Sequence, residues 1–275
     1  MRKFRPAFLV LLMAAGCGSL RNFSIFTTEQ EVELGRRVSE ELEAEVELLD
    51  DPAIVGYVQA IGAKVAARAW RQDITYEFKV IDDPEQANAF AIPGGHIYIF
   101  TGLLIRMDSE MELAAVLGHE AAHIAERHSM EALTRQVGLN LILAALTGEE
   151  AAAWQELLAD VGTTLAFAKF SRQDEKEADE LGLIFMYSAG YDPQGMVDLL
   201  ELFVELAERE LSVIELWLSS HPGTKQRVKM VKDLIREFNL YGGKTGKTEY
   251  LAVMKKLKAE GAPRRRVRPQ PRPRP

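Results

Sequence analysis

The sequence predicts a mostly helical α+β domain in which a small sheet of about three strands lies between helices. Apolar residues recur at helical spacing over residues 28–65 and through most of the chain after Gly102. Between these regions, residues 75–100 form short apolar stretches bounded by turn residues, as strands do. The chain has 275 residues, of which 47% are apolar, which is enough for one large core or two small ones.

The ends of the chain are predicted to lie outside this domain. Three basic residues within the first five precede an apolar run at 7–15, which suits a signal peptide and is too short to span a bilayer. Small residues lead to Cys17, so residues 1–16 are interpreted as a lipoprotein signal, Cys17 as the lipidated residue and 17–27 as a linker. Ala14 stands where such signals usually have leucine, and a plain secretory signal is the alternative. Cys17 is the one cysteine, which excludes an internal disulfide framework.

Residues 261–275 are mostly proline and arginine and are predicted to be a disordered, polyproline-like tail. The tail is either an electrostatic tether to an anionic envelope surface or a solubilising extension. The formal net charge of the whole chain is −8, which argues against a nucleic-acid-binding protein. The folded domain is therefore expected over residues 28–260.

The first helix is predicted over Thr28–Leu49, with an acidic outer face. Asp51 and Pro52 then read as a helix cap and a first helical residue, and a second helix follows to about Val65. Strand periodicity begins at Thr75 and ends at about Val80.

A second strand is expected within Ala87–Ile92 and a third over His96–Phe100, joined by a turn at Pro93-Gly94-Gly95. The chain after the sheet is predicted to be helical. Ser109 and Glu112 form a capping-box pattern that opens one helix. Further helices are expected over 137–146, 171–187, 193–218 and 224–238.

The stretch Gly118-His-Glu-Ala-Ala-His123 carries the chemistry. On a helix, His119 and His123 lie about 40° apart, one turn along, so their imidazoles can share one Zn²⁺. Glu120 lies about 100° around from His119, beside the metal, where it can take a proton from water and pass it to a leaving amine. This spacing is the metalloprotease signature. The alternative is an ordinary pair of surface or core histidines.

A catalytic zinc needs a third protein ligand and an open fourth position. Within 171–179, Glu175 and Asp179 share a helix face, whereas Glu177 points away. Small residues on both helices would allow close packing, so Glu175 is predicted as the third ligand. Asp179 is predicted to hold a histidine N–H from behind. The alternative is a charged, solvated helix face.

These pieces resemble metallopeptidase family forty-eight, the family of HtpX and the CAAX prenyl endopeptidases, and most closely its soluble periplasmic BepA-like lipoprotein branch. The resemblance covers about residues 28–238. It rests on "EQEVELGRRV", "DDPAIVGYVQAIGAKVA", "NAFAIPGGHIYIFTGLL", "LGHEAAHIAERHS", "FSRQDEKEADELG" and "SSHPGTKQRV". Several long motifs in order make it specific. It implies a zincin-type, gluzincin fold with a small β-sheet packed on the metal helix, and it supports Glu175 as the third ligand.

The resemblance adds further expectations. His221 is similar to a histidine that approaches the metal, where it would donate to the oxyanion or cover the fourth position in a resting state. Arg227 is similar to an arginine oriented toward the site. The alternatives are a helix-entry histidine and a surface salt bridge. His96 and His128 match no defensible ligand position and are interpreted as structural.

Substrate would bind as an added strand beside the metal helix. The residues expected to bind it are Asn88, Ala89, Phe90, Gly94 and Gly95.

The sequence thus predicts a zinc-dependent endopeptidase with one Zn²⁺ per chain, held by His119, His123 and Glu175, with Glu120 and His221 as catalytic groups. By family analogy, it would act on unfolded or misassembled proteins in quality control. It would sit on the periplasmic side of a bacterial envelope, with the outer membrane favoured, anchored through the lipid on Cys17. The rival class is a non-enzymatic chaperone or assembly factor with a structural or latent zinc. A membrane-embedded prenyl-type protease is not expected, because the sequence has no apolar span of about twenty residues.

Overall fold

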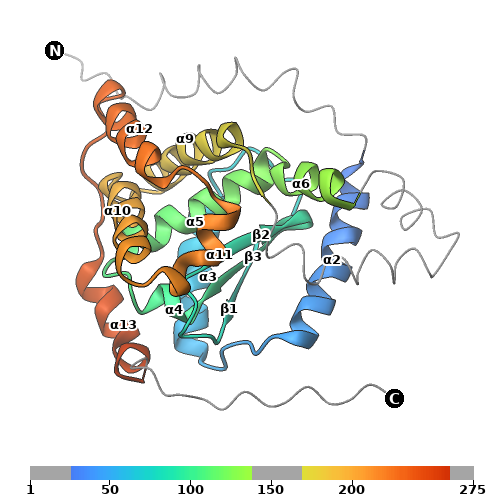
Figure 1. The fold of residues 1–275 in the computed structure, drawn as a ribbon, viewed down its shortest axis with the longest axis horizontal. Helices are drawn as coiled ribbons and strands as arrows, with labels where there is room; N and C mark the ends of the chain where they lie inside the picture. Colours follow the sequence, from blue (N-terminus) through green and yellow to red (C-terminus); the bar gives the residue numbers. More distant parts are fainter. Residues whose placement is uncertain (1–25, 138–168, 261–275) are drawn as a thin grey trace, which may run out of the picture.

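The computed structural model describes residues 26–137 and 169–260 and confirms the predicted class, a mostly helical α+β fold with one small sheet. Figure 1 shows the sheet near the centre, with helix α5 running across it and other helices stacked beyond α5. The predicted signal peptide and lipidated Cys17, the C-terminal tail, and most of the helix predicted over 137–146 lie outside the described residues.

The elements carry the labels of Figure 1, and their bounds are as follows. The helices are α2 (Thr28–Glu45), α3 (Pro52–Ala66), α4 (Thr101–Leu104), α5 (Glu110–Ala125), α6 (His128–Val137), α9 (Arg172–Ser188), α10 (Gln194–Arg209), α11 (Leu211–Ser220), α12 (Thr224–Glu237) and α13 (Lys247–Glu260). The strands are β1 (Glu77–Ile81), β2 (Ala89–Ile92) and β3 (His96–Phe100), with a 3-10 turn, η1 (Pro93–Gly95), between the last two.

The N-terminal helices begin where the sequence indicates, but the first ends early. Asp51 caps α3 by accepting from the N–H groups of Ala53 and Ile54, and Pro52 is the first helical residue. Helix α2 ends at Glu45 instead of continuing to Leu49. The backbone turns extended there, and the Leu49 N–H donates to the Val80 carbonyl over 2.9 Å, so this segment joins the edge of the sheet.

The sheet has the strand order β1-β3-β2, with β1 parallel and β2 antiparallel to β3. The predicted Pro-Gly-Gly turn joins β2 to β3, and Phe90 of β2 stacks on its cross-strand partner Tyr98 with ring centroids 5.2 Å apart. One face of the sheet packs against α3 and α5, whereas α2 lies along η1 and β2. Strand β2 is therefore an edge strand that lies next to α5.

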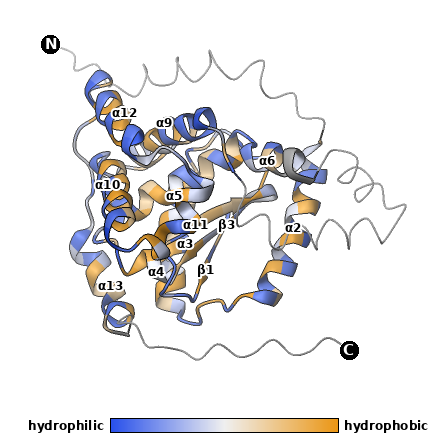
Figure 2. Cartoon of the chain, in the orientation of Figure 1, coloured by the Kyte–Doolittle hydropathy of each residue, from blue (hydrophilic) through white to orange (hydrophobic). Residues whose placement is uncertain are grey.

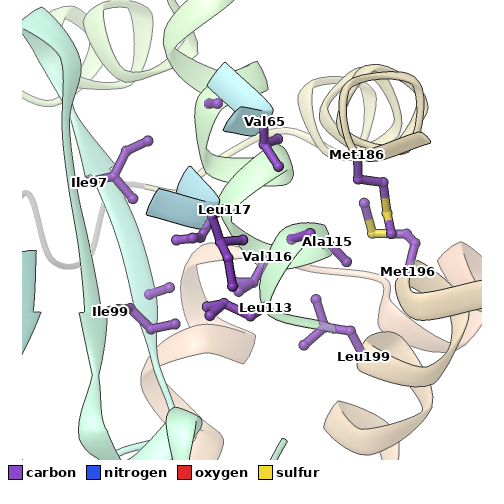
Figure 3. Packing of buried hydrophobic residues seen from close by; sticks show 14 of the residues in the cluster. Val65, Ile97, Ile99, Leu113, Ala115, Val116, Leu117, Met186, Met196 and Leu199 are labelled. Carbon is purple, nitrogen blue, oxygen red and sulfur yellow. The ribbon is translucent and has the colours of Figure 1, made fainter. Parts of the chain in front are cut away.

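Helix α5 forms the centre of the core, because every residue from Leu113 to Ala125 is buried. In Figure 3, its side chains fill the space between Ile97 and Ile99 of the sheet and Met186, Met196 and Leu199 of α9 and α10. Figure 2 shows the corresponding pattern, with apolar strands and α5 inside and polar faces on the outer helices such as α12. A helix that is buried all round can hold polar side chains only if they have partners or a ligand.

The C-terminal half differs from the prediction at two places. The helix predicted over 193–218 is two helices, because Glu210 leaves the helical region with φ −139° and ψ 52°. The break lets the Val213 carbonyl accept from the Ala87 N–H and brings the Glu210 carboxylate 3.1 Å from Arg106.

Helix α13 was not among the predicted helices. It is anchored by Tyr250, whose hydroxyl donates to the Leu104 carbonyl over 2.6 Å. Within 26–137 and 169–260, no helix is long and apolar enough to cross a membrane.

Candidate metal centre

Helix α5 presents the histidine and glutamate side chains. It begins after Ser109, whose hydroxyl accepts from the Glu112 N–H, while the Glu112 carboxylate accepts from the Ser109 hydroxyl and the Asp108 N–H. This is a variant of the predicted capping box. His119, Glu120 and His123 are all 1% exposed or less. Such burial rules out the surface alternative and requires that the three polar side chains be compensated from another element.

That element is α9, which packs against α5 more extensively than any other described helix. Ser171 caps α9 with a capping box closed by Asp174. The helices approach so closely at Gly118 and Gly182 that a Cβ added to Gly182 would lie 2.8 Å from the His119 nitrogen. The close approach brings Glu175 and Asp179 of α9 up to the histidines of α5.

Four side chains, from two helices and the end of a third, converge. The ligand atoms of His119, His123, Glu175 and His221 all lie within 4.8 Å of one another. The His119 and His123 Nε2 atoms are 3.1 Å apart, and His123 Nε2 is 3.4 Å from Glu175 Oε1. His221 follows the end of α11, and its Nδ1 lies 2.9 Å from Glu175 Oε1 and 3.4 Å from His119 Nε2.

This donor set fits a zinc ion. Tetrahedral zinc ligands at about 2.0–2.1 Å would lie about 3.3 Å from one another, close to the distances between these four side chains. Imidazole nitrogens and a carboxylate are ligands that zinc accepts, and the set carries one negative charge to meet the ion's two positive ones. His119, His123 and Glu175 are the predicted ligands, and His221 is a fourth group within ligand distance.

Aromatic rings hold His221 in this position. Trp217 stacks on His221 with ring centroids 4.0 Å apart and an interplanar angle of 20°. Phe170 stacks on His123 in the same way, at 3.9 Å and 22°. Neither Trp217 nor Phe170 was singled out from the sequence, because an aromatic residue carries no site signal until its neighbours are known.

Arg227 of α12 lies behind the carboxylates and is 5% exposed, so the surface salt bridge considered for it is wrong. Its guanidinium donates to both oxygens of Asp179 and to Oε2 of Glu175. Asp179 in turn lies with Oδ1 3.1 Å from Nδ1 of His119. The buried cation therefore compensates two buried carboxylates, one of which orients a histidine.

The pKa values of two buried glutamates at this site are shifted in opposite directions. Burial raises the pKa of Glu120 to about 7, with Glu175 adding to the shift and His119 and Arg227 opposing it. Burial also opposes the ionised form of Glu175, but Arg227 and His221 prevail and hold its pKa well below 4.5. Glu175 is thus ionised at neutral pH, whereas Glu120 can gain or lose a proton near neutral pH.

The residues predicted to bind substrate separate into two groups. In the β2–β3 ladder, the Phe100 N–H donates to the Asn88 carbonyl, so the backbone groups of Ala89 and Ala91 point to the outer edge. The Asn88 side chain is 1% exposed, and its amide has no hydrogen-bond partner among the described residues. Phe90 stacks on Tyr98.

Gly94 and Gly95, by contrast, are packed against other backbone. Both have positive φ, and an added Cβ would lie 3.1 Å from the Val32 Cα at Gly94 and 2.0 Å from the Thr75 carbonyl at Gly95. These contacts account for the two glycines without a ligand.

The two histidines interpreted as structural differ in their surroundings. His96 lies away from the ligand set, with Nδ1 3.1 Å from Glu77. His128 lies with its Nδ1 3.1 Å from Nδ1 of His123. Five-residue spacing from His123 gave no reason to expect this, because a continuous helix would place the two residues about 140° apart.

Comparisons with known proteins find relatives of this chain among metallopeptidases. A model of peptidase family M48 matches residues 52–235, more than half of the chain. Mitochondrial metalloendopeptidase OMA1 of Schizosaccharomyces pombe is 36% identical over 183 residues, which are 66% of this chain and 53% of that protein. Beta-barrel assembly-enhancing protease of Escherichia coli is 29% identical over 245 residues, 85% of this chain and 50% of that protein. The chain thus spans about half the length of these two relatives.

Proposed function

The chain belongs to peptidase family M48, and from that premise we propose that it is a zinc-dependent endopeptidase. The observation that carries the proposal is the convergence of His119, His123 and Glu175 beside the buried Glu120. When bound, zinc would act as a Lewis acid toward a peptide carbonyl and would acidify water. His119, His123 and Glu175 would hold it, one ion per chain.

Glu120 is the proposed acid–base group. Its carboxylate is fully buried, and its pKa of about 7 suits a group that first takes a proton and then returns it. The Nε2 atom of His221 lies 3.9 Å from Oε1 of Glu120 and has no hydrogen-bond partner among the described residues. A protonated Nε2 there would donate to the oxygen anion that forms when a peptide carbonyl is attacked.

The substrate is proposed to bind as an extended strand along β2. Because Ala89 points its backbone groups outward, a peptide laid beside β2 can form main-chain hydrogen bonds with little demand on its sequence. Asn88 adds a buried amide that can donate to and accept from a peptide backbone. Such recognition suits unfolded segments, and it supports a proposed role in protein quality control. The proposed place of action is a cell envelope, with the protein anchored through a lipid on Cys17, and this part of the proposal rests on the sequence pattern before Cys17.

His221 favours a second candidate, a non-enzymatic chaperone or assembly factor with a structural or latent zinc. Structural zinc sites have four protein ligands and no open position, and the four side chains of this set are each 1% exposed or less. The two candidates differ in whether Glu120 is needed and in whether removal of His221 opens the site.

The deciding experiment is digestion of casein by purified zinc-loaded protein, beside Glu120→Gln and His221→Ala variants shown to hold equal zinc. The peptidase proposal expects cleavage by the unmutated protein or by His221→Ala, loss of cleavage in Glu120→Gln, and inhibition by a chelator. If all three proteins hold zinc and none cuts, the non-enzymatic candidate replaces it. Cleavage by Glu120→Gln at the parent rate would remove Glu120 from the mechanism.

A further inference from the structure

We infer that His128 and Glu177 form a hydrogen-bonded chain that fixes the ring orientation and tautomer of His123, so that both are positioning residues for the metal ligand. The inference rests on the proposed zinc site and assigns a role to two residues that the sequence did not connect with it. His128 begins α6, and Glu177 lies on α9, so these hydrogen bonds would also join the two helices.

The contacts are direct, and the two histidines are buried, whereas the Glu177 side chain is 20% exposed. Nδ1 of His128 lies 3.1 Å from Nδ1 of His123, and Nε2 of His128 lies 3.5 Å from Oε2 of Glu177. His128 is 3% exposed and His123 is fully buried. Phe170 stacks on the face of His123 and closes that side of the ring. Phe170 and the contact with His128 together therefore restrain rotation of the His123 ring about its Cβ–Cγ bond.

The tautomers of the two histidines determine which atom donates in each of these hydrogen bonds. A neutral imidazole that offers the Nε2 lone pair to a metal carries its proton on Nδ1. His123 Nδ1 then donates, so His128 Nδ1 must accept, and the proton of His128 resides on Nε2. That N–H faces the Glu177 carboxylate, which is the acceptor it requires. Gln173 donates to the other oxygen of Glu177 over 2.9 Å and holds that carboxylate on its helix.

A special backbone turn creates the contact. Helix α5 ends at Ala125, and Arg127 adopts φ 60°, the left-handed region that residues other than glycine rarely occupy. The Arg127 guanidinium donates to the Phe26 carbonyl over 2.9 Å, and its Nε lies 3.3 Å from the buried Glu31. Because the turn is held in this way, the backbone changes direction after α5 and His128 lies beside His123.

The two metal-ligating histidines of α5, His119 and His123, thus have different hydrogen-bonding partners behind them. His119 lies against the Asp179 carboxylate directly, whereas His123 reaches a carboxylate through a second imidazole. Partners of this kind keep ligand rings in place and raise their basicity, and losing one weakens metal affinity about 10- to 100-fold.

The test measures the zinc dissociation constant of the full chain by competition with a chromophoric chelator. His128→Leu removes the acceptor, whereas His128→Asn retains one, because asparagine Oδ1 occupies the position of histidine Nδ1. Glu177→Ala removes the far end of the chain. His96→Leu is the matched control, since His96 is also a buried histidine paired with a glutamate at 3.1 Å but lies away from the ligand set. Visible spectra of the cobalt-substituted proteins provide a second readout that does not depend on peptidase activity.

We expect at least about tenfold weaker zinc binding and altered cobalt bands in His128→Leu, with a smaller loss in Glu177→Ala. His128→Asn should recover most of the affinity, and His96→Leu should stay within about threefold of the parent. The inference is overturned if His128→Leu binds zinc like the parent, if His128→Asn is no better than His128→Leu, or if His96→Leu loses as much. If the unmutated protein binds no zinc, both the proposed function and this inference are overturned. If it binds zinc but does not cut casein, only the proposed function fails, and the zinc affinities of the variants still test the roles of His128 and Glu177.

Discussion

Arg227 and Asp179 face each other through two parallel hydrogen bonds, with Nε 2.7 Å from Oδ2 and Nη2 2.7 Å from Oδ1. The third guanidinium nitrogen, Nη1, donates to Glu175. One side chain from α12 therefore fixes both carboxylates that α9 contributes to the candidate metal centre. The planar fork of arginine makes this arrangement possible, and a lysine could not reproduce it.

Substitution of Arg227 is therefore expected to cost stability as well as zinc affinity. Arg227→Met would leave two buried carboxylates without their cation, and the free energy of unfolding should fall by about 3–5 kcal/mol. Arg227→Lys should lose nearly as much, because it cannot donate to both carboxylates. Urea unfolding measures the effect. Arg236→Ala on the same helix is the control, since its ion pair with Asp233 is exposed and should be worth under about 1 kcal/mol. Equal losses in Arg227→Met and Arg236→Ala would contradict the argument.

Gly182→Ala is expected to separate α5 from α9. The new Cβ would lie 2.8 Å from the backbone nitrogen of His119, and backbone cannot swing aside, so the helices must shift at a cost of about 1–3 kcal/mol. Zinc affinity should fall with stability, because Glu175 would recede from the histidines. Gly56→Ala is the matched control in an exposed helical position where the Cβ meets nothing within 4 Å. It should gain about 0.5–1 kcal/mol. An unchanged zinc dissociation constant in Gly182→Ala would show that the close approach is not needed.

The two buried glutamates should respond to pH with opposite signs. The Glu120 pKa rises from 4.5 unfolded to about 7 folded, so its contribution is fully present below pH 4.5 and is lost as the pH rises through 7. Glu120→Gln mimics the neutral form. In chelator-treated protein, it should therefore be more stable than the parent at pH 8, by up to about 3 kcal/mol, and nearly equal to it at pH 4.

Glu175→Gln is the matched comparison. The lowered pKa of Glu175 gives stability that is present above pH 4.5 and is lost as the pH falls below that value. This variant should therefore be less stable than the parent at pH 8. Urea unfolding at pH 4 and pH 8 tests both variants, and a loss of stability at pH 8 in Glu120→Gln would refute the raised pKa.

Asn88→Ala is expected to weaken activity without weakening the fold. A buried amide without a partner costs about 1–3 kcal/mol, so its removal should leave the melting temperature unchanged or raise it. If Asn88 binds the peptide backbone, kcat/KM for casein should fall about tenfold, the equivalent of one hydrogen bond. Thermal unfolding and casein digestion measure the two effects. A lower melting temperature with unchanged kcat/KM would assign Asn88 to the fold instead of the substrate.

The sequence by itself determined the parts of this protein that depend on neighbours within a few positions. Helical spacing puts His119 and His123 on one face of α5. Asp51 and Ser171 each start a helix by accepting backbone N–H groups with a side-chain oxygen. The long motifs indicated the peptidase family, which the comparison with its model confirmed.

The tertiary structure decided the contacts between elements that are distant along the chain or separated by a turn. His221 lies 102 positions from His119 and reaches the ligand set because Glu210 breaks the helix before α11 and Trp217 stacks on the imidazole. His128 meets His123 because Arg127 takes a left-handed conformation that only its buried partners make tolerable. The local pattern of residues favours a helix on either side of each break, but the angle at the break is set by packing and by buried charge.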